Sequence, residues 1–168
     1  NEDGTVRKIP VNPHTRANAS STDRNTWGTF AQAIGTIATS QGALGLGFVF
    51  SSEDTIFGLD IDHCIVDGEL SEKANALLTE LSGTYAELSP SGTGVHLYGY
   101  GPTGKGINAR GRGELYGQGR FFTVTGQVLS NRPLTLSEFS PELMAWLVQE
   151  LSGVQGSTPH AGADTGNY

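Results

Sequence analysis

Hydrophobic side chains recur every three or four residues in three stretches of the chain, which is the spacing of an amphipathic helix. Each stretch follows a residue that favours the N-cap position, and each is followed by glycine. The third stretch also begins with proline, whose missing N–H is harmless in the first turn. The pattern predicts helices over residues 27–38, 72–81 and 141–151, capped by Thr26, Ser71 and Ser140 and ended by Gly42 with Gly45, by Gly83 and by Gly153.

Short apolar runs bounded by glycine, proline or serine lie between these stretches and are typical of β-strands. Residues 46–50 and 55–62 flank the turn-like Ser-Ser-Glu-Asp and are expected to pair with each other. Residues 114–117 and 120–126 are expected to form a hairpin around the intervening glycines. Further strands are predicted over residues 7–11, 84–88 and 95–100, and a long glycine-rich connection over 101–113.

The order of these elements predicts the fold class. Strands and helices alternate irregularly, which favours an α+β fold with one largely antiparallel sheet flanked by helices over a doubly wound parallel sheet. The 168 residues suit a single domain, expected over residues 1–151. Residues 152–168 lack periodicity and are predicted to be a disordered tail or linker. Because the chain begins at Asn1 rather than methionine, a segment upstream is expected to be missing.

Composition and charge narrow the setting. No apolar run approaches the ~20 residues of a membrane span, and the single cysteine without a signal-peptide pattern predicts a reducing, cytoplasmic location. The net charge is −7, which argues against a simple nucleic-acid binder. However, residues 50–90 carry nine acidic and one basic side chain, whereas residues 91–132 carry five basic and one acidic. Such a split suits a site that joins metal ligands to a polyphosphate, and it equally fits scatter over two solvated surfaces.

Two aspartates interrupt the apolar run of residues 55–62. Side chains alternate along a strand, so Asp60 and Asp62 face one side while Phe57, Leu59 and Ile61 face the core. Two carboxylates held in this way repel each other, and a hard divalent cation relieves the repulsion. The pair also fits an ordinary solvated strand face. Gly58 favours function, because it leaves room on the same face for a ligand.

Two later stretches carry further polar candidates. A turn at residues 89–94 can present hydroxyl and N–H groups to an anion, through Ser89, Ser91, Gly92 and Gly94. His96 follows at the start of a strand and is expected to point to the same side as Tyr98. Glu114 stands in a strand beside an arginine cluster, and Arg120 opens the next strand. Taken singly, each also fits a β-turn, a strand histidine or a surface charge.

In combination, these stretches resemble the archaeo-eukaryotic primase superfamily. The three motifs are Asp60-x-Asp62, then Ser-Pro-Ser-Gly-Thr-Gly-Val-His at 89–96, then Glu114-Leu-Tyr followed by Arg-Phe-Phe-Thr-Val-Thr-Gly at 120–126. The likeness is to primase-polymerase domains of phages and other mobile elements, and residues 7–30 are similar to their Lys-x-Pro segment and tryptophan-bearing helix. It covers roughly residues 7–128 and implies a primase-like core related to the RNA-recognition-motif fold.

The resemblance implies a template-directed DNA polymerase, a nucleotidyltransferase, with primase activity as a further expectation in the replication of a phage or mobile element. Asp60, Asp62 and Glu114 would bind Mg²⁺ or Mn²⁺, and a two-metal site promotes in-line displacement of pyrophosphate. The nucleotide triphosphate would meet His96 and the turn that contains Ser89, Ser91, Gly92 and Gly94. Lys8 and Arg120 would contact phosphate or template, and Phe121 would pack against the nucleotide sugar.

The implied partners are a DNA template with its primer, and dNTPs or NTPs. In relatives a helical domain, and often a helicase, follows the catalytic core, and primer synthesis can depend on it. Primer extension is therefore the main expectation for this chain.

Two other functions compete with a polymerase. One is a noncatalytic DNA- or nucleotide-binding replication module of the same fold, against which the intact set of Asp60, Asp62, His96 and Glu114 argues. The other is a metal-dependent phosphoesterase or nicking enzyme, which would require a nucleophile or paired metal-binding histidines. The four histidines of the chain show no His-x-His spacing.

Overall fold

The computed structural model describes residues 8–42, 45–102, 107–109 and 112–153. The helices are η1, a 3-10 helix (Arg24–Thr26), α1 (Phe30–Ala38), α2 (Glu72–Glu80) and α3 (Pro141–Ser152). The strands are β1 (Leu46–Val49), β2 (Ile56–Ile61), β3 (Ile65–Val66), β4 (Glu69–Leu70), β5 (Ala86–Leu88), β6 (Val95–Tyr100), β7 (Ile107–Ala109), β8 (Gly113–Tyr116) and β9 (Phe121–Val124). The predicted α+β class is confirmed, and all pairs of these strands are antiparallel.

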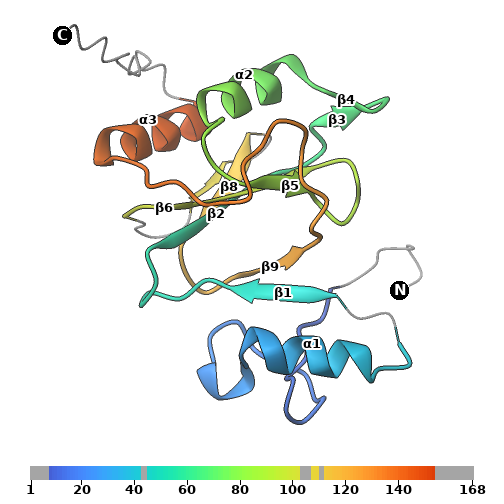
Figure 1. The fold of residues 1–168 in the computed structure, drawn as a ribbon. Helices are drawn as coiled ribbons and strands as arrows, with labels where there is room; N and C mark the ends of the chain where they lie inside the picture. Colours follow the sequence, from blue (N-terminus) through green and yellow to red (C-terminus); the bar gives the residue numbers. More distant parts are fainter. Residues whose placement is uncertain (1–7, 43–44, 103–106, 110–111, 154–168) are drawn as a thin grey trace, which may run out of the picture.

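The strands form two main layers rather than the single sheet that was predicted. The larger layer is a five-stranded sheet in the order β5-β6-β2-β8-β7, and the smaller is the two-stranded ribbon β1-β9. In Figure 1, α2 and α3 cover one side of the five-stranded sheet, the ribbon lies on its other side, and α1 lies beyond the ribbon. The two sides of the central sheet therefore meet different surroundings.

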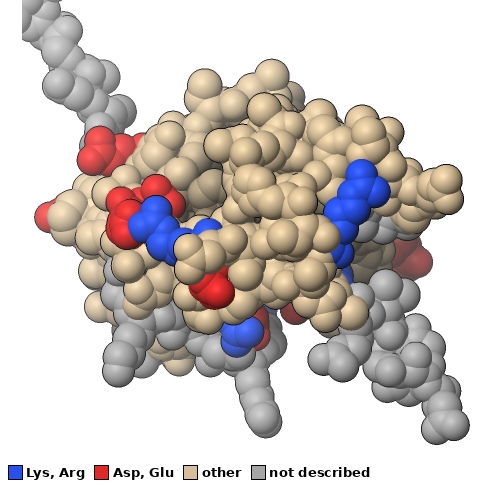
Figure 2. Space-filling view, turned by 90° about the horizontal axis from the view of Figure 1, so that it is seen from below, with Lys and Arg blue, Asp and Glu red and all other residues tan. Residues whose placement is uncertain are grey.

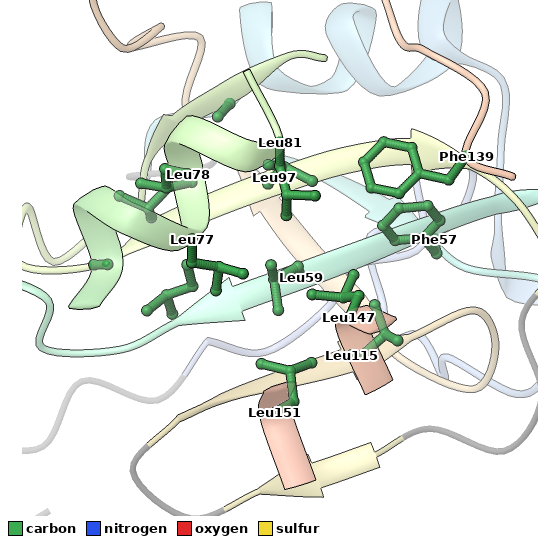
Figure 3. Packing of buried hydrophobic residues seen from close by; sticks show 14 of the residues in the cluster. Phe57, Leu59, Leu77, Leu78, Leu81, Leu97, Leu115, Phe139, Leu147 and Leu151 are labelled. Atoms are coloured by element: carbon green, nitrogen blue, oxygen red, sulfur yellow. The ribbon is translucent and has the colours of Figure 1, made fainter. Parts of the chain in front are cut away.

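The main hydrophobic core lies between the five-stranded sheet and its two helices. Phe57, Leu59 and Ile61 of β2 are buried there, which confirms the alternation that the sequence predicts for this strand. Figure 3 shows leucines of α2 and α3 converging on β2 from the helical side. Because the core takes every second residue of β2, the intervening Asp60 faces the ribbon side.

A second, aromatic core fills the space between the sheet and the ribbon. Phe50, Tyr98, Tyr116 and Phe122 are buried in it. A Cβ atom added to Gly58 would lie 2.2 Å from the Phe50 ring and 2.5 Å from the Phe122 ring. The expectation that Gly58 leaves room for a ligand is therefore wrong, because aromatic rings occupy that room.

Two predicted strand pairings are wrong because the ribbon forms a layer separate from the five-stranded sheet. β1 pairs with β9, and neither pairs with its neighbour in the sequence. The backbone N–H of Phe50 donates to the Arg120 carbonyl at 2.9 Å, and the Gly119 N–H donates to the Phe50 carbonyl at 3.1 Å, so the ribbon continues past both strands. The chain crosses between layers after Phe50 and again before Arg120, which separates 46–50 from 55–62 and 114–117 from 120–126.

The first helix and the segment before it also differ from the prediction. α1 begins after Thr29, which forms a capping box with Gln32, so the helix starts three residues later than expected. Trp27 instead lies outside the helix and donates its indole N–H to the Ser20 carbonyl at 2.6 Å. Within residues 8–11 there is no strand, only a bridge from Val11 to Asn18. Pro10, directly before Val11, and Pro13, two residues after it, lack the N–H that a strand ladder requires.

Of the other predicted helix ends, three are confirmed and one is wrong. Ser71 and Ser140 cap α2 and α3, and Gly153 ends α3 in the left-handed conformation, all as predicted. Gly83 does not end α2, whose C-cap is Leu81.

Two regions of strand were not predicted: β7 inside the glycine-rich connection, and the β3-β4 hairpin. The hairpin turns at Asp67-Gly68, both with positive φ, as a tight primed turn requires. Residues 154–168, most of the predicted tail, lie outside the described residues. Within the described residues, no helix is long and apolar enough to cross a membrane.

Candidate functional site

Polar side chains form one row across the five-stranded sheet. The strand register places Glu87 opposite His96, His96 opposite Asp60, and Asp60 opposite Glu114. On the other side of β8, the backbone of Asn108 in β7 pairs with that of Glu114. Three residues that the sequence singles out from distant motifs are thus direct neighbours on β6, β2 and β8. Asp62 follows the end of β2 and is exposed.

Asp60 is held in an electrostatically unfavourable position. Its Oδ1 atom is buried and has no hydrogen-bond partner among the protein groups described. Burial, above all, raises the pKa of Asp60 from 3.8 to about 6, and the negative charges of Asp62 and Glu114 add to the rise. His96 and Lys8 oppose it. A cation at this position would relieve both the desolvation and the repulsion.

Glu114 is half-buried and linked to the far edge of the site. The Tyr116 hydroxyl donates to Glu114 Oε2 at 2.8 Å. The exposed guanidinium of Arg120 lies over the Tyr116 ring, 5.0 Å from its centroid. Tyr116 therefore connects the candidate metal ligand Glu114 to the candidate phosphate contact Arg120.

The serine and glycine turn binds its own polar groups. Ser89 Oγ lies 2.9 Å from Ser91 Oγ, which in turn lies 3.0 Å from the Thr93 hydroxyl. The N–H groups of Gly92 and Gly94 both donate to Ser89, at its carbonyl and its Oγ respectively. Gly92 has a φ of +74°, and a Cβ at Gly94 would lie 2.9 Å from the Ile61 carbonyl. Both glycines are thus required by the turn, and its serine hydroxyls are the groups that can rotate toward an anion.

His96 is almost fully buried at the centre of the row. Its Nδ1 lies 3.1 Å from the Thr123 carbonyl, and because a carbonyl only accepts, Nδ1 is the donor. Nε2 faces Asp60 Oδ1 at 3.6 Å. The ring stacks on Phe122 with centroids 4.7 Å apart. His96 and Tyr98 share this side of the sheet, as predicted.

Phe121 lies away from this row. Strand alternation turns it to the other face of the ribbon from Phe122, into a groove of about 850 Å³ between the ribbon, α1 and the preceding segment. Lys8 and Trp27 also line this groove. Lys8 influences the Asp60 carboxylate, so the groove and the polar row approach each other at that residue.

The basic segment of residues 91–132 does not act as one surface. Arg112 donates to the Glu150 carbonyl at the end of α3, and Arg132 donates to carbonyls at the end of α2. Among the arginines of this segment that the structure describes, only Arg120 lies beside the polar row. Lys105 and Arg110 lie outside the described residues. On the α1 face, Figure 2 shows Lys and Arg side chains at separate places with uncharged surface between them.

Sequence reasoning missed Glu87, which is fully buried next to His96. A signal was present: in Tyr-Ala-Glu-Leu, strand alternation sets Tyr85 and Glu87 on one face, as it sets Asp60 in β2. The fold gives Glu87 its significance, because only the strand register shows that it stands behind His96.

The residue types at this site are those that bind a hard divalent cation. Their side chains, however, are not spaced closely enough to hold one. The charges of Asp62 and Glu114 act on Asp60, whose Oδ1 is unpartnered, and oxygen ligands are those that Mg²⁺ and Mn²⁺ prefer. Nevertheless, no three His, Cys, Asp or Glu side chains within the described part of the chain lie close enough together to hold a metal ion.

Comparison with known proteins gives one informative relative. Over 133 residues, the chain is 36% identical to a DNA primase-polymerase from Nitratiruptor phage NrS-1, an alignment that covers 74% of this chain. The chain spans 18% of the length of that relative. No protein-family model matches the sequence.

Proposed function

Because the chain belongs to the primase-polymerases of the archaeo-eukaryotic primase superfamily, we propose that it is a metal-dependent nucleotidyltransferase that extends a DNA primer along a template. The observation that carries the proposal is the register of β2 and β8, which sets Asp60 opposite Glu114, together with the buried, unpartnered Oδ1 of Asp60. Primer synthesis is proposed as a second activity, since the relative is a primase as well as a polymerase.

The five-stranded sheet with α2 and α3 is proposed as a primase-like core, related to the RNA-recognition-motif fold. In support, the helices cover one face of the sheet and leave the polar row on the other. Residues 1–151 would form the catalytic domain. A helical domain or helicase in the longer protein is the proposed partner for priming, as the aligned relative is several times longer than this chain.

Asp60, Asp62 and Glu114 would hold Mg²⁺ or Mn²⁺. Divalent ions bound there would supply positive charge beside the α-phosphate and would lower the pKa of the primer 3′-hydroxyl. The buried position of Asp60 would favour a bound cation, since an uncompensated carboxylate is disfavoured there. Asp62 is exposed and would turn toward the ions from the end of β2.

Binding and orientation of the nucleotide would come from the residues around this row. His96 presents Nε2 toward Asp60, and we propose that the Nε2–H of the doubly protonated ring donates to a phosphate oxygen, since Nδ1–H already donates to the Thr123 carbonyl. The hydroxyls of Ser89 and Ser91 would rotate from each other to the same triphosphate. Arg120 and Lys8 would contact phosphate or template from the rim. A sugar contact for Phe121 would lie in the groove beside α1.

Primer extension on a labelled primer-template with Mg²⁺ or Mn²⁺ tests the proposal. We expect extension by the wild type, and a loss of at least about a hundredfold in both Asp60→Ala and Glu114→Ala, since each removes a proposed metal ligand. Glu69→Ala is the matched control, because Glu69 is an exposed carboxylate on β4 outside the row. An unprimed template assayed in parallel measures primer synthesis.

The outcomes separate the polymerase from a noncatalytic module. If Asp60→Ala and Glu114→Ala extend primers as well as Glu69→Ala does, the assigned metal ligands are wrong. If the wild type binds DNA and nucleotide but extends nothing, even within the longer natural protein, the chain is a binding module.

A further inference from the structure

Glu87 is the most deeply buried acidic residue described in this chain. It sits in the middle of β5 with a fully buried side chain, although acids are rarely buried without partners. The proposed chemistry assigns it no part, because it is separated from Asp60 by the whole width of β6. Its burial therefore calls for a reason.

Four donors hold the Glu87 carboxylate. The Tyr85 hydroxyl donates to Oε2 at 2.6 Å, and the Tyr98 hydroxyl donates to Oε1 at 3.3 Å. The backbone N–H groups of Thr125 and Gly126 donate at 3.1 and 2.8 Å. Burial alone would raise the pKa of Glu87, but the adjacent His96 ring together with the hydrogen bonds from Tyr85 and these backbone groups outweighs it and lowers the pKa to about 2. The side chain is thus a fixed negative charge.

This charge reaches His96 by two routes. Directly, Glu87 Oε1 lies 3.7 Å from His96 Nδ1. Indirectly, Glu87 binds the backbone just beyond β9, and the last part of that strand supplies the Thr123 carbonyl that accepts from Nδ1. With Nδ1 engaged on this side, Nε2 is the ring nitrogen directed at Asp60.

We propose that Glu87 is a positioning residue, which holds the His96 ring in one orientation with a proton on Nδ1, so that Nε2 faces the nucleotide site and, when it also carries a proton, donates to a phosphate oxygen. The supporting arrangement is the continuous row from Glu87 through His96 to Asp60, with Phe122 stacked on the ring. Carboxylates that bind the rear nitrogen of a functional histidine act in this way elsewhere. The consequence for nucleotide binding rests on the proposed function, whereas the orientation of the ring does not.

The competing explanation is that Glu87 only joins β5 to the end of β9. Thr84→Val is the control for a general loss of buried hydrogen bonds beside β5. The Thr84 side chain is also fully buried, and its hydroxyl bonds the Tyr98 carbonyl at 2.6 Å and accepts from the Ser137 N–H at 3.0 Å. The substitution removes buried hydrogen bonds that join the segment before β5 to β6 and to Ser137, and it removes no bond to His96. Glu87→Gln keeps the shape of the side chain and removes its charge.

The first measurement is ¹⁵N NMR of histidine-labelled protein, wild type and both variants, without nucleotide. We expect a protected Nδ1–H signal from His96 in the wild type and in Thr84→Val, and its loss or broadening in Glu87→Gln. The second measurement is equilibrium binding of a fluorescent dATP analogue with Mg²⁺. Glu87→Gln should weaken binding by about tenfold, as loss of an orienting partner commonly does, and should weaken it no further in a His96→Asn background.

The outcomes test the orienting role of Glu87 and the proposed polymerase function separately. If the Nδ1–H signal is the same in Glu87→Gln as in Thr84→Val, or the binding losses add in the double variant, Glu87 does not act through His96 and the inference fails. If the signal behaves as expected but the wild type neither binds the analogue nor extends a primer, the proposed function fails while the orienting role stands. Comparison of thermal stability across the variants excludes a general loss of folding.

Discussion

At the scale of single residues, the site combines one carboxylate that the fold disfavours with one that it favours. Burial and like charges raise the pKa of Asp60, whereas hydrogen bonds lower that of Glu87. The two lie on either side of His96. An acid kept in unfavourable surroundings indicates a functional requirement, because stability alone would select an apolar residue there.

The lowered pKa of Glu87 predicts how acid affects folding. The pKa is about 2 in the folded protein against an ordinary 4.5, so ionised Glu87 stabilises the fold above about pH 4.5 and this contribution disappears as the pH falls toward 2. The shift corresponds to on the order of 3 kcal/mol. Urea unfolding at pH 5, 3 and 2 should show the difference in unfolding free energy between wild type and Glu87→Gln shrinking with acid. Parallel curves would contradict this assignment.

At the scale of elements, α2 shows how a distant side chain replaces a local signal. Arg132 is half-buried, and its guanidinium donates to the carbonyl of Leu78 in the last turn of α2 and to that of the C-cap residue Leu81. Carbonyl groups at this end of a helix have no intrahelical partners. It also reaches the Thr84 carbonyl at 3.5 Å. Gly83, the expected terminator, is not in the left-handed conformation. An arginine some fifty residues away thus ends the helix.

Removal of this arginine should destabilise the fold. In Arg132→Ala, carbonyl groups at a half-buried helix end lose their donors, and we expect a loss of about 1–3 kcal/mol in unfolding free energy. Arg112→Ala is the control, because the exposed Arg112 donates to a carbonyl of α3 that water can reach, so its loss should be below about 0.5 kcal/mol. Chemical denaturation measures both, and equal effects would rule out the capping role.

At the scale of the whole molecule, the contact between the sheet and the ribbon determines where the site lies. Gly58 lets the rings of Phe50 and Phe122 reach the sheet. Phe122 in turn stacks on His96, and the ribbon also supplies the Thr123 carbonyl. The ribbon is therefore part of the site, although it contributes no carboxylate to it.

Gly58→Ala tests this contact. The new methyl group would lie 2.2–2.5 Å from two rings, so the layers must separate, and we expect destabilisation of about 1–3 kcal/mol together with reduced primer extension. Gly35→Ala in α1 is the control, because a Cβ there meets no atom within 4 Å and alanine favours a helix by about 1 kcal/mol. Thermal unfolding with the extension assay measures both effects. A Gly58→Ala protein as stable as wild type would show that the layers are loosely packed.

Much of the local structure could be predicted because its causes are local. Ser71, Ser140 and Gly153 mark helix ends through contacts with residues three or four positions away. The alternation around Asp60 follows from the two-residue period of a strand. The order of the motifs sufficed to indicate the family, which the relationship to a phage primase-polymerase confirms.

The pairing of strands depended on the tertiary structure. Neighbouring strands in the sequence favour hairpins, since short loops lose little entropy on closure, but burial of the aromatic rings around Gly58 requires β1 and β9 to leave the central sheet. The same packing decided that Phe122, and not Phe121, meets His96.

By itself, then, the sequence determined the helix caps, the strand faces and the residue types of the site, because these depend on spacing along the chain. Only the tertiary structure decided which of those residues become neighbours. Asp60, His96 and Glu114 align because three strands share one register, and Glu87 joins them from a strand whose sequence carries no motif. Register results from long-range burial of one sheet face, a property of all the strands together.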